Sequence, residues 1–136
     1  MEEALALDNH DPEKLPAASL AGYGAFVLGS EFCGRLLPSQ AEARALRSVF
    51  KGRLILATPM LTEADLADVK KLLKLLAGTK GRLEVIANDL GLLEVLRASF
   101  SKKVEISCGR ILAHRLKIMP GEYVREFLKR YRIARF

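Results

Sequence analysis

The sequence has few cysteines and no long hydrophobic run, and each absence excludes a class of protein. The two cysteines, Cys33 and Cys108, lie far apart and have no partner at metal-ligand spacing. This argues against a disulfide framework and against a structural zinc site, so we assign no metal. The apolar runs span only a handful of residues, and the start, Met1-Glu2-Glu3, is acidic where a signal peptide is basic. We therefore expect a cytoplasmic protein that neither enters a membrane nor is secreted.

The chain also lacks the common nucleic-acid and nucleotide motifs. It has no arginine-glycine run, no interleaving of aromatic and basic residues, no DNA-binding motif and no Walker motif. The net charge is nevertheless +6, and it is uneven: residues 1–68 hold 6 basic and 10 acidic side chains, whereas residues 69–136 hold 16 and 6. Surface helices ordinarily carry such charges, which is the interpretation that we favour. Binding of RNA through phosphate neutralisation stays open as an alternative.

The length of 136 residues, half of them hydrophobic, suits one domain with a real core. Residues 1–20 mix charge and proline without sustained periodicity, so we expect a flexible acidic tail with at most one short helical turn. The domain proper then spans residues 21–136.

From Gly22 onward, short apolar runs alternate with amphipathic segments. Apolar runs bounded by glycine, proline or charge predict five strands, at residues 25–28, 53–57, 83–87, 104–107 and 132–136. Capping residues predict the helices between them: Ser39 with Glu42 opens a helix through Phe50, Thr62 opens one that Gly78 ends, Asn88-Asp89 precedes a third, and Pro120 starts a fourth.

Strand-helix-strand repeats require parallel strands joined by right-handed crossovers. Two architectures fit: a partial (β/α)8, TIM-like barrel of about five strands, or a five-stranded doubly wound sheet. Periodicity alone does not separate them. Because a complete (β/α)8 barrel typically needs about 250 residues, the first architecture would be an open arc.

Polar residues follow the ends of four expected strands, and in parallel sheets such ends share one mouth. They are Ser30-Glu31, Thr58, Asn88-Asp89 and Cys108-Gly109-Arg110. We predict Glu31 and Asp89 as catalytic residues, since two carboxylates suit acid-base chemistry. We predict that Asn88, Gly109 and Arg110 bind substrate, with Arg110 as an anion clamp.

Structural alternatives stay open for the same residues. Asp89 could be only the N-cap of the third helix and Asn88 only a turn former, while Glu31 and Arg110 could pair with each other. Cys108 has no histidine fixed beside it, and His114 has no ligand or catalytic partner at the required spacing. We assign no role to either of them.

Three stretches carry a resemblance to a known family: Ser30–Pro38, Asn88-Asp89-Leu90-Gly91, and Cys108-Gly109-Arg110-Ile111-Leu112. They are similar to the first β-α loop, the Asn-Asp-(Leu/Trp)-Gly element and the Leu-Gly-Arg-Leu-Leu element of the collagenase-like peptidase family U-thirty-two. The resemblance spans residues 29–136. It implies a barrel rather than a doubly wound sheet, and an activity either as a peptidase or as an oxygen-independent hydroxylation factor, for quinones or RNA, that binds an iron-sulfur cluster.

The sequence departs from that family near the expected fifth strand, because it lacks the carboxyl-terminal half that would carry the cysteine-rich region. Cys33 and Cys108 match no cluster motif, so the cofactor stays unassigned. We therefore predict a peptidase-like half barrel that needs a complementary half through self-association or a second chain. The alternative is a non-enzymatic binding module whose basic second half engages RNA or an acidic protein.

Overall fold

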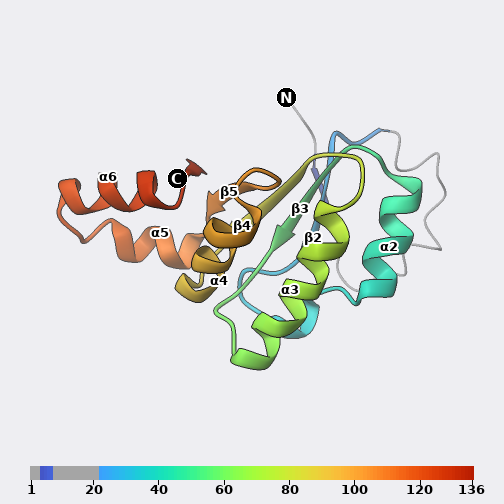
Figure 1. The fold of residues 1–136 in the computed structure, drawn as a ribbon, viewed down its shortest axis with the longest axis horizontal. Coiled ribbons are helices and arrows are strands. Elements are labelled where there is room, and N and C mark those ends of the chain that lie inside the picture. Colours follow the sequence, from blue (N-terminus) through green and yellow to red (C-terminus); the bar gives the residue numbers. More distant parts are fainter. Residues whose placement is uncertain (1–3, 8–21) are drawn as a thin grey trace.

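The computed structural model describes residues 4–7 and 22–136, which contain one sheet of six parallel strands (Figure 1). The strands follow the order of the chain across the sheet, and each pairs only with its neighbours in sequence. They are β1 (Ala4–Leu7), β2 (Ala25–Gly29), β3 (Arg53–Ala57), β4 (Leu83–Ala87), β5 (Glu105–Cys108) and β6 (Ile133–Arg135). The five expected strands are confirmed as β2 to β6.

The sequence analysis does not predict strand β1. Ala4–Leu7 lies within residues 1–20, yet it pairs with β2 in parallel, with Ala4 opposite Ala25. Four apolar residues are too few to show a period, but pairing with β2 gives their backbone groups hydrogen-bond partners. The rest of the expected tail lies outside the described residues.

The sequential order does not fit the alternative of a doubly wound sheet. In such a sheet the chain reverses direction, so that strands adjacent in space are not adjacent in sequence at the switch point. Here the described strands advance from β1 to β6 without a reversal. Successive crossovers of one hand place their helices on one face of the sheet.

Helices connect β2 to β6 as the capping residues predict. They are η2 (Gly34–Leu36), α2 (Gln40–Val49), α3 (Glu63–Ala77), α4 (Leu90–Val95) with the π-helical turn η3 (Leu96–Phe100), α5 (Arg110–Leu116) and α6 (Gly121–Arg130). Both expected caps are present as reciprocal capping boxes, Ser39 with Glu42 and Thr62 with Asp65. The sequence analysis missed η2, η3 and α5.

The hydrophobic core lies between the helices and one face of the sheet. Alternate strand residues such as Phe26, Leu56 and Val85 are fully buried there against helix residues such as Leu73 and Leu92. Figure 1 shows α3 and α4 crossing in front of the strands. Within the described chain, no helix is long and apolar enough to cross a membrane.

The opposite face of the sheet carries apolar side chains such as Val27, Ile55 and Ile86, and near the starts of β3, β4 and β5 it also carries charged ones. Arg53 on β3 forms an ion pair with Glu84 on β4, and both side chains are buried. Ser107 on β5 donates a hydrogen bond to the same carboxylate, and Arg135 on β6 lies 3.8 Å from it. The network therefore joins four neighbouring strands on the face without helices.

Candidate functional site at the carboxyl ends of the strands

Asn88, directly after β4, is the centre of the strand-end site. Its side chain is buried, and its Nδ2 donates to Glu31 Oε2 at 3.1 Å and to the Thr58 carbonyl at 2.9 Å. Its Oδ1 accepts from the backbone amides of Ile111 at 3.0 Å and Leu112 at 3.2 Å. An amide side chain has two donor hydrogens and two acceptor lone pairs, so its capacity is filled. Asn88 thus links three strand ends to the start of α5.

Glu31, in the loop after β2, completes the same link from the other side. Its Oε2 accepts from the Arg110 amide at 2.6 Å, and its Oε1 accepts from Arg110 Nε at 3.1 Å. Burial raises the pKa of Glu31, but the hydrogen bonds from Arg110 and Asn88 outweigh it and leave the pKa below its ordinary value. Glu31 is therefore an ionised carboxylate that caps α5, and its pairing with Arg110 confirms one of the alternatives.

Arg110 is the part of this site that reaches solvent. Its side chain is 77% exposed, although Glu31 holds its Nε, and its guanidinium lies 5.0 Å from the centre of the exposed Phe32 ring. This is a cation-π contact across the mouth. The two terminal nitrogens of Arg110 make no hydrogen bond within the described residues and remain free to bind an anion.

Asp89 caps α4, as the structural alternative predicts. Its Oδ1 accepts from the Leu92 amide at 3.1 Å, and its Oδ2 accepts from the Leu61 amide at 3.3 Å, so it ties α4 to the loop after β3. Glu31 and Asp89 share no hydrogen-bond partner within the described chain. The structure therefore gives the two predicted catalytic carboxylates separate structural tasks.

Gly109 is buried beneath Asn88. A Cβ atom at this position would lie 2.2 Å from both Nδ2 and Oδ1 of Asn88, a distance that no side chain can occupy. The glycine is required here for space, since its φ of −74° is open to any residue. The side chain of Asn88 covers Gly109 on the side where a Cβ atom would lie. The substrate-binding role of Gly109 stays a prediction.

Cys108 is not activated by its surroundings. Burial, and after it the charge of Glu31, raise the pKa of its thiol to about 11. Only the thiolate is a nucleophile, so Cys108 is almost wholly in the unreactive form at neutral pH. Within the described residues no group of histidine, cysteine and acidic side chains could hold a metal ion.

Two recesses lie beside the mouth, and the sequence analysis did not anticipate them. One, of about 430 Å³, runs from Gly34 to Glu42 along the loop before α2 and reaches Asp65 and Asp68 on α3. The other, of about 420 Å³, is lined by Phe32, Cys33, Gly34, Arg35 and Asp65. Phe32, an aromatic residue within the polar loop after β2, was the available sequence signal for the second recess.

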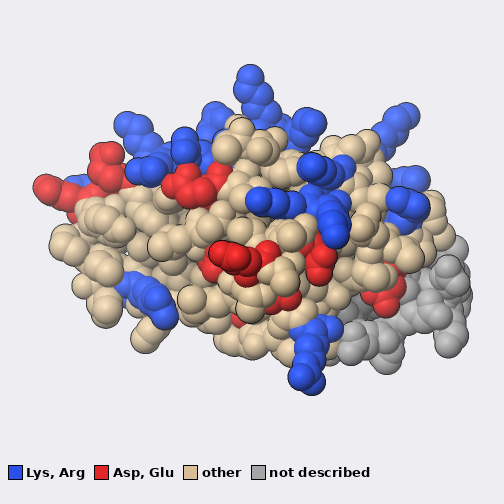
Figure 2. All heavy atoms as spheres, turned by 60° about the horizontal axis from the view of Figure 1, so that its bottom comes forward, with Lys and Arg blue, Asp and Glu red and all other residues tan. Residues whose placement is uncertain are grey.

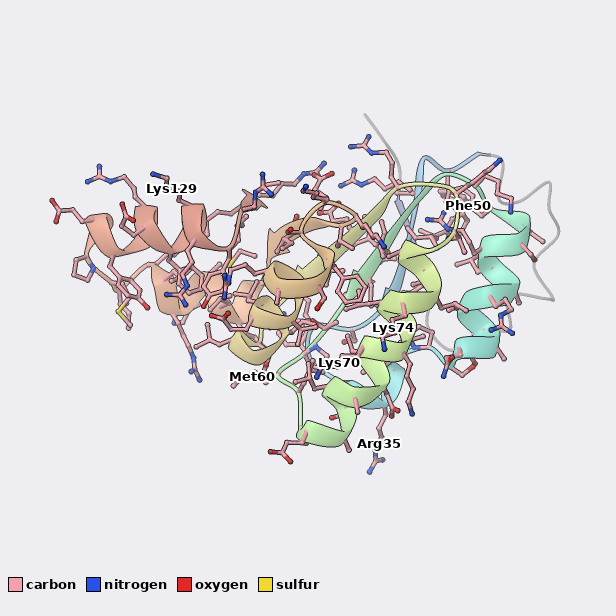
Figure 3. All side chains as sticks on the ribbon, viewed as in Figure 1. Arg35, Phe50, Met60, Lys70, Lys74 and Lys129 are labelled. Atoms are coloured by element: carbon pink, nitrogen blue, oxygen red, sulfur yellow. The ribbon has the colours of Figure 1, made fainter. Side chains whose placement is uncertain are left out.

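Figure 2 turns the lower end of Figure 1 toward the viewer and shows acidic side chains grouped in the middle of that face. Strand β3 points to this end in Figure 1, and Met60, just beyond it, lies low in Figure 3. The described loops after β2, β3 and β4 lead from this end into α2, α3 and α4. Acidic residues in first helical turns, as in α2, α3 and α6, are favourable because of the helix dipole.

Comparison with models of known protein families, with curated proteins and with solved structures finds no match to this chain. The arrangement itself can bind an anion through Arg110, with Glu31 and Asn88 fixing the backbone behind it. It contains no paired nucleophile and base.

Proposed function

We propose that the chain forms part of a (β/α)8-type barrel and contributes one side of a strand-end active site, related to that of the collagenase-like peptidase family. Further β-α units, in the same polypeptide or in another, complete it. The observation that carries the proposal is the sequential order of six parallel strands, in which the described helices connect β2 to β6 one after another. That is the arrangement from which a (β/α)8 barrel is built.

The face without helices supports this proposal. In a closed barrel this face points inward, and its side chains pack in layers contributed by alternate strands. Glu84 contacts Arg53, Ser107 and Arg135 from three other strands, so a polar cluster already spans four consecutive strands on this face. A polar layer needs partners on every side, so additional strands beyond β6 would continue the network at the half-exposed Arg135.

Within that site the residues of this chain would bind and position the substrate, and they would not carry out the chemical step. Arg110 offers its terminal nitrogens to a carboxylate or another anionic group of the substrate. Glu31 and Asn88 act through Arg110 and are positioning residues. The proton transfers of a peptidase would then depend on groups from the additional units, because Glu31 and Asp89 are engaged with backbone amides.

The edge strand offers a direct test of barrel completion. Among the described strands β6 pairs with β5 alone, so the outer backbone groups of Ile133–Arg135 are open to another strand. We expect the 136-residue chain to self-associate with rising concentration in size-exclusion chromatography with light scattering. Ala134→Lys, which places a charge on the exposed edge, should abolish the association.

The matched control is Ala98→Lys, at an exposed position in η3 far from β6 in sequence. It adds the same charge and should leave the association unchanged. A chain that is monomeric at all concentrations would contradict completion by self-association, and equal effects of the two variants would contradict the role of β6 in it.

A further inference from the structure

The amino ends of the strands form a second surface, opposite the mouth. The loops that precede β3, β4 and β5 meet there, because the strands are parallel and adjacent. Five exposed basic residues lie in these loops, and we call them the amino-end rim: Lys51, Lys80, Arg82, Lys102 and Lys103. Residues 50–52, 78–82 and 101–104 contain no aspartate or glutamate. The amino-end rim thus contains Lys51 from residues 1–68 and four basic residues from residues 69–136, the half of the chain with the excess of basic side chains.

The helix dipole does not account for these charges. It favours cations in the last turn of a helix, such as Lys74 in α3, and the effect falls off beyond that turn. Lys80, Lys102 and Lys103 lie after the helices have ended. Among the rim residues only Arg82 forms an ion pair within the described chain, with Glu105 at 3.3 Å.

A buried arginine holds the rim together. Arg47 on α2 is 2% exposed, and it donates to the Gly52 carbonyl at 2.7 Å, to Thr79 Oγ1 at 3.1 Å and to the Arg82 carbonyl at 3.1 Å. All three acceptors are neutral oxygens, and no carboxylate pairs with Arg47 within the described residues. Its charge therefore adds to the positive potential of the loops that it joins.

The rim is also hollowed. A recess of about 350 Å³ opens between the loops before β4 and β5. Its lining includes Arg82, Ser101, Lys102 and Lys103, together with Glu105, whose carboxylate pairs with Arg82. Its size accommodates a phosphodiester group with its water. Phe50 and Phe100, at the rim loops, are buried, and Tyr23, just before β2, is half-buried with its ring against Phe26. The three rim loops themselves therefore present no exposed ring on which an unpaired base could stack.

We propose that the amino-end rim binds the phosphate backbone of a double-stranded nucleic acid without reading its sequence. Clustered lysines and arginines neutralise phosphates and release counterions, which is sufficient for such binding. The absence of exposed rings in these loops favours a duplex over a single strand. The surface lies at the other end of the sheet from Arg110 and on no part of β6, so it does not depend on barrel completion.

The test compares two triple variants of equal charge by fluorescence anisotropy with a labelled duplex of mixed sequence. The rim variant is Lys80→Ala/Lys102→Ala/Lys103→Ala. The control is Lys70→Ala/Lys71→Ala/Lys74→Ala, which removes three lysines from α3; Figure 3 shows Lys70 and Lys74 along that helix, away from the end where Phe50 lies. Thermal unfolding of both variants reports whether they remain folded.

We expect the chain to bind the duplex at low salt, with affinity falling steeply as salt rises. The rim variant should bind at least tenfold more weakly, and its slope of log affinity against log salt should be smaller by about 2 to 3. The control variant should bind within about twofold of the original chain. Competition with a single strand of equal length and with polyglutamate identifies the class of anion.

Four results would overturn the proposal. These are no binding to the duplex at low salt, equal losses in the two variants, tighter binding of the single strand, or equal competition by polyglutamate per charge.

Discussion

The side chain of Asn88 fills the space in which a Cβ atom on Gly109 would lie. Two residues from successive strand ends are thereby fitted together, and the fit brings the amides of Ile111 and Leu112 within reach of Asn88 Oδ1. This contact between Asn88 and Gly109 fixes the arrangement of the loops at the carboxyl ends of the strands.

Gly109→Ala should therefore destabilise the protein. The added methyl group forces Asn88 out of place, which combines overpacking with the loss of buried hydrogen bonds, and we expect a cost of about 2–4 kcal/mol in chemical denaturation. Gly121→Ala is the matched control, because nothing lies within 4 Å of a Cβ there. Its free energy of unfolding should change by no more than about 0.5 kcal/mol. Equal effects of the two substitutions would show that Asn88 can move freely.

Asn88→Asp tests the two hydrogen bonds that Asn88 Nδ2 donates. At neutral pH the new carboxylate would face Glu31 Oε2 and the Thr58 carbonyl, which now accept hydrogen bonds at 3.1 and 2.9 Å. Two carboxylates at this distance repel each other, so the variant should lose stability at pH 7 and regain part of it on acidification. Asn88→Ala removes the same hydrogen bonds without the charge. If both variants showed the same pH profile, the contact with Glu31 would be unimportant.

Glu31 gives the strand-end site a pH dependence of defined sign. Its pKa in the folded protein lies below its ordinary value of about 4.5, so the ionised form stabilises the fold above that pH. The contribution is lost as the pH falls below 4.5 through the lowered pKa. The stability difference between the original chain and Glu31→Gln should thus be constant near neutrality and shrink in acid. A difference that grew on acidification would reverse the assigned direction.

Cys108 should react slowly with alkylating reagents. With a pKa of about 11, its thiolate fraction at pH 8 is far below that of a free cysteine. In a Cys33→Ser variant, which isolates Cys108, we expect iodoacetamide to react at least tenfold more slowly than with the urea-unfolded chain, and the rate to keep rising above pH 9. A fast reaction that levels off near pH 8 would mean that the thiol is activated after all.

Arg47→Lys tests the arginine that joins the loops of the amino-end rim. A lysine keeps the charge but cannot span Gly52, Thr79 and Arg82 at once, so we expect a loss of about 3 kcal/mol in stability. Arg44→Lys, at an exposed position on the same helix, should be neutral. Urea denaturation of both variants shows whether the three hydrogen bonds of Arg47, rather than its charge, stabilise the fold.

The sequence predicts the parts of the fold that local patterns determine. Short apolar runs and capping residues give β2 to β6, the capping boxes at Ser39 and Thr62, and the N-cap at Asp89, all of which the structure contains. The short helix α5 was missed because its first turn carries Arg110 and depends on Glu31 and Asn88 for hydrogen bonds. Leu112 and Leu116, four residues apart and both buried, were the available signal for it.

The predicted site residues were harder to interpret from sequence. Asn88 and Arg110 do lie near Glu31, as the shared mouth predicts. The pairing of Glu31 with Arg110 was one of the alternatives, but the hydrogen bonds of Asn88 could not be foreseen, because a polar residue at a strand end looks the same whether it contacts a ligand or a backbone amide. The catalytic roles proposed for Glu31 and Asp89 stay predictions.

The sequential order of the strands also bears on how the chain acquires its fold. Every described strand after β1 pairs with the strand synthesised just before it, so no segment has to wait for a more distant one. Closing the loop to the preceding strand costs less chain entropy than closing a longer loop to a distant one. Each β-α unit can therefore dock onto the previous one as it leaves the ribosome, and the growing sheet serves as the template for the next strand.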